Sequence, residues 1–189
     1  MAFIQEGNYA LTEDEKEHIQ HIYRTHYQDI YQFLVFFTGD QNEAEDLTQE
    51  VFIRLFRSLS NYDGRSPLKL YILSIARYTA IDHYRKKKFK YVFSDYWIKK
   101  IPATFGLPEK ELQQKELQQN LQQIFQSLKP KHRMVIILRG LRELSIKETA
   151  EILGCSEAKV KVDYHRALKI MQKKCLIPTM GGLYDELAK

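Results

Sequence analysis

Apolar side chains recur every three or four residues along most of this chain, which is the spacing of an amphipathic helix. The stripes predict helices over 19–37, 42–59, 66–88, 108–129, 132–142, 146–153 and 156–174. We expect Gly39 to end the first helix and Asn42 to cap the second. No segment alternates apolar and polar residues for long, so no strand is predicted. The expected fold class is all-α.

A break in this periodicity divides the chain. Residues 91–107 mix aromatic and basic side chains with Pro102 and Gly106 and show no helical stripe. We therefore predict two small helical domains, at 19–90 and 111–175, joined by a linker at 91–110. The polar residues 1–17 are expected to form a frayed arm.

Residues 144–166, with the sequence LSIKETAEILGCSEAKVKVDYHR, have the pattern of a helix-turn-helix. Ala150 is small enough for close helix packing, Gly154 suits a turn that needs a positive φ, and Val160 points into the core. Basic side chains fill the outer face of the second helix, which favours a helix that enters a DNA groove. The alternative is an ordinary helical hairpin. The candidate DNA-contacting residues on this helix include Lys159, Lys161, His165 and Arg166.

Charge is distributed in blocks along the chain, whose formal net charge is +5. Residues 65–90 hold eight Lys or Arg against one acid, and residues 124–174 hold twelve against five. Residues 40–50 instead hold five acids and no base. Two polyanion contacts and one surface for a basic protein partner would explain this pattern. Solvated helix faces without partners are the alternative.

Cysteine content and hydropathy limit the class of protein further. The two cysteines, Cys155 and Cys175, imply no disulfide framework, and no Cys or His cluster has metal-ligand spacing. We therefore expect no metal and no cofactor. The longest apolar runs are too short to cross a bilayer, so a cytoplasmic protein without direct membrane insertion is expected.

The acidic helix at 43–56 places Asp46 and Glu50 on one face with Gln49 beside them. Paired carboxylates can serve acid–base chemistry or a metal, but no His or Gly-rich loop lies nearby in sequence. A docking surface for a basic protein is the favoured interpretation.

Aromatic and basic residues interleave between Ser60 and Lys88. Aromatic rings stack on unpaired bases while Lys and Arg neutralise phosphates, so this block indicates binding of single-stranded nucleic acid. For Tyr71 and Tyr84 a core-lining role is the alternative. The turn at 61–66, at the head of the following helix, is placed to receive a flipped base.

Three segments in this order resemble bacterial sigma factors of the extracytoplasmic-function (ECF) group: DLTQEVF, GRSPLKLYILSIARYTAIDHYRKK and the helix-turn-helix. The resemblance covers roughly residues 23–174. It implies a sigma-2 and a sigma-4 helical domain, and a factor without enzymatic activity that directs core RNA polymerase to promoter DNA. It also implies control by an anti-sigma factor, which could be membrane-bound.

The resemblance assigns roles to individual positions. The residues implied to bind polymerase are Asp46, Gln49, Glu50, Val51 and Phe52. The residues implied to read and melt the −10 element are Asn61, Tyr62, Arg65, Ser66, Lys69, Tyr71, Arg77, Arg85 and Lys86. The residues implied to contact the −35 element are Arg139, Lys159, Lys161, Val162, His165 and Arg166. The family often has Arg where this chain has Asp163, and an acid there would repel phosphate unless it accepts from a cytosine amino group.

Two other functions fit parts of the sequence. A stand-alone transcriptional regulator would use residues 1–120 for sensing or dimerisation and would bind duplex DNA without polymerase. A metal-dependent hydrolase would use Asp46 and Glu50. The stacking side chains of 60–88 argue against the first, and the lack of further ligands argues against the second.

Overall fold

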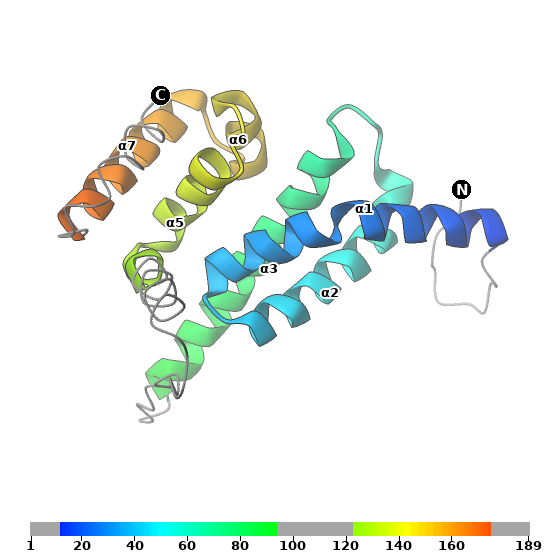
Figure 1. Ribbon diagram of the computed structural model, residues 1–189, viewed down its shortest axis with the longest axis horizontal. Helices are drawn as coiled ribbons and strands as arrows, with labels where there is room; N and C mark the ends of the chain where they lie inside the picture. Colours follow the sequence, from blue (N-terminus) through cyan, green and yellow to red (C-terminus); the bar gives the residue numbers. More distant parts are fainter. Residues whose placement is uncertain (1–11, 94–122, 175–189) are drawn as a thin grey trace, which may run out of the picture.

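The computed structural model describes residues 12–93 and 123–174. Every regular element in these two ranges is a helix (Figure 1), which confirms the all-α class. Most of the predicted linker and the beginning of the helix predicted at 108–129 lie outside the described residues. The domain boundaries 19–90, 91–110 and 111–175 therefore remain predictions.

The N-terminal half is a bundle of three long helices, α1 (Glu13–Thr38), α2 (Gln41–Ser58) and α3 (Leu68–Phe93). A short 3-10 turn, η1 (Leu59–Asn61), follows α2. The three helices pack pairwise against one another. Their buried side chains form the core between them, and the largest are Ile30, Phe33, Leu34, Phe37, Leu55, Ile72 and Leu73.

Helix capping explains where α1 and α2 begin. α1 starts earlier than predicted, because Thr12 and Glu15 form a reciprocal capping box. Residues 13–17 are thus helical rather than part of a frayed arm. Gly39 ends α1 with φ 77°, as expected. The cap of α2 is Asp40 instead of Asn42, because the Asp40 carboxylate accepts from the backbone N–H groups of Asn42 and Glu43.

The C-terminal half holds helical residues 123–127, α5 (Pro130–Ile136), a π-helical turn η2 (Ile137–Leu141), α6 (Ile146–Leu153) and α7 (Glu157–Lys174). The bounds of α6 match the prediction, and α7 starts one residue later than expected. The helix predicted over 132–142 is instead α5 followed by the π-turn, which shifts the backbone register before α6.

The two halves are in contact. α6 packs against α3, while α5 and η2 pack against α1, and the buried apolar side chains of both halves form one cluster. In Figure 1 α5 and α6 lie next to α3 and the C-terminal end of α1, and α7 lies on the outside.

None of the helices described here is long and apolar enough to cross a membrane. Within residues 12–93 and 123–174 there is also no group of three His, Cys, Asp or Glu side chains arranged to hold a metal ion.

Candidate nucleic-acid and protein interfaces

The outer face of α2 presents polar side chains to solvent. Asp46 and Gln49 are exposed, and Glu50 is half-buried with its Oε1 2.7 Å from Nε of Arg54, one turn along the helix. A helix surface with these side chains can accept hydrogen bonds and cations from a basic partner.

Val51 and Phe52 occupy the opposite side of α2. Val51 is fully buried, and Phe52 is 3% exposed with its ring centroid 4.7 Å from that of Tyr23 in α1. Their burial does not fit the expectation that these two side chains contact polymerase. They hold α2 against α1, so that the polar face of α2 points outward.

The turn between α2 and α3 is built around two tyrosines. The Tyr62 and Tyr71 rings lie 5.1 Å apart, the Tyr62 hydroxyl donates to the carbonyl of Ser66, and the Tyr71 hydroxyl donates to Oγ of Ser58 at 3.0 Å. Tyr71 is partly buried against the core, which agrees with the core-lining alternative, and its contact with unpaired bases stays a prediction. These contacts fix the turn, and they leave Asn61 and Arg65 exposed.

The other predicted −10 residues lie along α3 in different surroundings. Lys69 Nζ is 2.8 Å from Oδ2 of Asp29 in α1. The Arg77 guanidinium lies 4.3 Å from the ring centroid of Tyr78, a tyrosine that is 57% exposed. Arg85 and Lys86 are exposed near the end of the helix. α3 therefore carries basic side chains along its length, together with an accessible aromatic ring.

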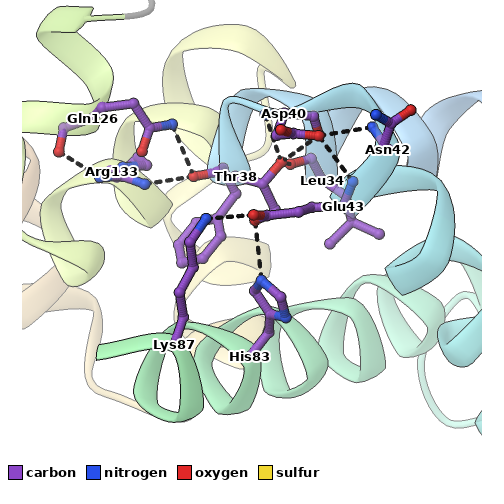
Figure 2. Close-up of polar contacts among 10 residues, drawn as sticks. Leu34, Thr38, Asp40, Asn42, Glu43, His83, Lys87, Gln126 and Arg133 are labelled. Atoms are coloured by element: carbon purple, nitrogen blue, oxygen red, sulfur yellow. Dashed lines mark hydrogen bonds and ion pairs between the residues drawn. The ribbon is translucent and has the colours of Figure 1, made fainter. Parts of the chain in front are cut away.

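A polar cluster that the sequence interpretation missed joins the beginning of α2 to the second half of α3. Glu43 accepts from Lys87 with Oε1, and its Oε2 lies 3.0 Å from Nε2 of His83 (Figure 2). The spacing of His83 and Lys87, four residues apart in a helix, is visible in the sequence. Their shared partner Glu43, forty or more residues away, is not.

The helix-turn-helix has the predicted geometry. Gly154 adopts φ 60°, and Ala150 and Val160 are buried between α6 and α7. Ser145 and Glu148 form a capping box that starts α6. Lys161, His165 and Arg166 are exposed on α7. A basic helix face is therefore open to solvent, as a helix that enters a major groove requires.

Asp163 does not lie on this exposed face. It is 7% exposed, and its carboxylate oxygens lie 2.7 Å from Lys159 Nζ and 3.6 Å from Lys131 Nζ. Burial raises the pKa of Asp163, but the hydrogen bond from Lys159 and the charge of Lys131 outweigh it, so the pKa lies below its usual value. The acid therefore neither repels phosphate nor reads cytosine in this arrangement. It holds Lys159 against α7.

Arg139 is also drawn inward. Its Nη1 donates to the carbonyl of Leu144, and its guanidinium lies 5.6 Å from the ring centroid of Tyr164 in α7. In this conformation Arg139 fixes the segment before α6, and its predicted contact with DNA would require the side chain to turn outward.

Two arginines of the C-terminal half bind α1. Arg142 Nη1 lies 2.9 Å from Oδ1 of Asp29 and its Nη2 donates to the Asp29 carbonyl. Burial raises the pKa of Asp29, but Lys69 and Arg142 together lower it below its usual value. Asp29 is thus shared between α3 and the C-terminal half.

The second arginine, Arg133, is 3% exposed and donates to four backbone carbonyls. One belongs to Phe37 at the end of α1, and Gln126 donates to the same carbonyl at 3.3 Å. Figure 2 shows Arg133 and Gln126 reaching toward the chain beside Thr38. The sequence interpretation assigned no role to these residues.

Both halves of the chain match known protein families. Residues 22–90 match the family model of Sigma-70 region 2, and residues 118–171 match that of Sigma-70 region 4. The ECF RNA polymerase sigma factor SigX of Bacillus subtilis is 38% identical over 169 residues, which cover 84% of this chain and 84% of SigX. The chain belongs to the ECF group of bacterial sigma factors. It is thus a transcription initiation factor that acts with RNA polymerase at promoters, and it is not an enzyme.

Other relatives agree with this assignment. The ECF sigma factor chain is 35% identical to the RNA polymerase sigma factor YlaC of Bacillus subtilis, over 84% of this chain and 92% of YlaC. The alternatives of a stand-alone regulator and a metal-dependent hydrolase are therefore set aside.

Solved structures share the fold of this ECF sigma factor. The sigma factor RpoE, in complex with the anti-sigma factor NepR from Bartonella quintana, superposes with a TM-score of 0.69 at 21% identity, covering 86% of this chain and 99% of RpoE. CnrH, in complex with the cytosolic domain of CnrY, gives a TM-score of 0.63 at 19% identity, covering 84% of this chain and 87% of CnrH.

Proposed function

We propose that three separate surfaces divide the work of this sigma factor. The exposed face of α2, with Asp46, Gln49 and Glu50, docks on core RNA polymerase. The turn after α2, together with the basic and tyrosine side chains of α3, binds the melted −10 strand. The exposed face of α7 lies in the major groove of the −35 duplex.

The observation that carries this proposal is the position of the basic face of α7. Lys161, His165 and Arg166 are exposed, whereas Val160 and Asp163 face the core. This is the orientation in which a recognition helix offers its donors to base edges and phosphates. The acidic face of α2 lies in the other half of the chain, so the two kinds of partner need not compete.

A binding measurement on the reconstituted holoenzyme tests this division. Arg166→Ala should weaken binding to a promoter by about threefold to tenfold, because one phosphate or base contact is lost. Binding to core polymerase should not change. The control is Lys16→Ala, which removes one positive charge from the first turn of α1, far from α7 in sequence. Equal loss of polymerase and promoter binding in Arg166→Ala would contradict the proposed division.

We also propose that the protein is cytoplasmic and that an anti-sigma factor binds it. The similarity of its fold to RpoE, solved with the anti-sigma factor NepR, and to CnrH, solved with the cytosolic domain of CnrY, supports this proposal. Co-purification of a small partner protein that blocks polymerase binding would support it further, and full activity of the chain in every growth condition would count against it.

A further inference from the structure

One apolar side chain lies among the basic side chains on the outer face of α7. Val162 is 46% exposed, and it does not belong to the side chains that pack against the hydrophobic core of the described residues. Its exposed neighbours are Lys161, His165 and Arg166. Core packing therefore does not explain a valine at this position.

The position of Val162 within the helix is informative. It lies in the first two turns of α7, which starts at Glu157, and this is the part of a recognition helix that meets base edges. Ala158, also exposed, lies one turn earlier on the same face. The two side chains form a small apolar strip within a basic surface.

Neither side chain can donate or accept a hydrogen bond, so neither can read the polar groups of a base edge or hold a phosphate. The major groove offers one apolar group, the C5 methyl of thymine. Contact with that methyl group removes apolar surface of both partners from water, which is favourable. An exposed valine on a groove-facing helix is therefore suited to thymine.

We propose that Val162 is a specificity-determining residue that selects thymine at one position of the −35 element, with Ala158 leaving room for the base. This inference rests on the proposed role of α7 in the −35 groove. It adds a base preference that the charged residues of α7 do not provide. Lys161 and Arg166 would favour guanine or phosphate instead.

The test uses the full chain with core RNA polymerase. Selection from duplexes with a randomised −35 region first gives the preferred element. Each thymine of that element, on either strand, is then replaced by deoxyuridine, which removes the methyl group and keeps every hydrogen-bonding group. One such replacement should weaken binding about fourfold, the size expected for one buried carbon group.

Variants assign the effect to Val162. Val162→Ala should weaken binding to the thymine duplex by a similar factor and should bind the thymine and deoxyuridine duplexes equally well. Leu141→Ala removes the other exposed large apolar side chain of residues 123–174 and should keep the full difference between the two duplexes. Val162 lies outside the core, so its truncation should not alter folding.

The outcomes separate this inference from the proposed function. The proposed methyl contact is overturned if no replacement of a thymine by deoxyuridine weakens binding. It is also overturned if Val162→Ala still binds the thymine duplex more tightly than the deoxyuridine duplex. If Arg166→Ala also leaves promoter binding unchanged, the placement of α7 in the −35 groove fails as well.

Discussion

Arg142, just after the π-helical turn of the C-terminal half, places its Nη1 2.9 Å from Oδ1 of Asp29 in α1. The same carboxylate binds Lys69 of α3 through its other oxygen at 2.8 Å. One acid of the N-terminal half therefore ties a predicted −10 residue to the domain that carries the helix-turn-helix. The contact between the halves is polar at this point, and polar contacts of this kind can open when a partner competes for them.

Arg142→Ala should loosen the contact between the halves. The variant loses two hydrogen bonds to Asp29, and because Lys69 still neutralises the carboxylate we expect a loss of about 1–2 kcal/mol in the free energy of unfolding. Urea denaturation followed by circular dichroism measures this. Arg24→Ala, which removes an exposed arginine from α1, should cost much less. The same loss in both variants would mean that the Asp29 contact adds no stability.

His132 should make stability depend on pH near neutrality. It is 6% exposed, and neither ring nitrogen has a hydrogen-bond partner among the described residues. Burial, and then the charge of Lys131, lower its pKa below the usual value. The neutral form therefore stabilises the folded state above a pH of about 6.5, and this contribution is lost as the pH falls through the lowered pKa.

The measurement is the urea midpoint between pH 7.5 and pH 5. The midpoint of the wild type should fall as the pH falls, and His132→Leu should flatten that fall while keeping stability at the upper end. Burial likewise lowers the pKa of His26 in α1, so His26→Ala is measured as well, to show how much of the fall in the midpoint comes from His26. If the urea midpoint of His132→Leu falls with pH as steeply as that of the wild type, His132 does not cause the pH dependence.

Gly154 should be required for its backbone conformation alone. It adopts φ 60°, and a Cβ placed there would meet no atom within 4 Å. Gly154→Ala should therefore cost about 1 kcal/mol, and Gly154→Asn less, because Asn tolerates the left-handed region. Gly39→Ala should cost slightly more, since its Cβ would lie 2.3 Å from Nε2 of Gln126, and that exposed side chain would have to move and give up its hydrogen bond to the Phe37 carbonyl. Thermal unfolding ranks the variants, and a larger loss for Asn than for Ala at 154 would contradict the conformational explanation.

Much of this fold could be predicted because its signals are local. The stripe of α2, the φ of Gly39 and Gly154, and the bounds of α6 all follow from neighbouring residues. The capping box of Thr12 and Glu15 is an equally local signal, although the polar, acidic residues around it are also typical of a frayed arm. The π-turn at 137–141 has no such signal in the neighbouring residues.

The polar contacts could not be predicted in the same way. Asp29 and Arg142 are 113 residues apart in the sequence, and Phe37 and Arg133 are 96 residues apart. No periodicity in the sequence links the members of either pair. Asp163 shows the limit within the site. Its position on α7 was known from the sequence, but only the packing of Lys131 and Lys159 around it explains why an acid is tolerated there.

The most direct test of the account is capture of core RNA polymerase by the full chain, compared with a Gln49→Ala/Glu50→Ala double variant. The exposed face of α2 is proposed to carry the contact, so the wild type should retain polymerase and the variant should lose roughly tenfold or more in affinity. A Glu17→Ala/Gln20→Ala variant, which changes the same two residue types on the exposed surface of α1, should bind like the wild type. Retention of full affinity by the Gln49→Ala/Glu50→Ala variant, with its helical spectrum intact, would contradict the proposed docking surface.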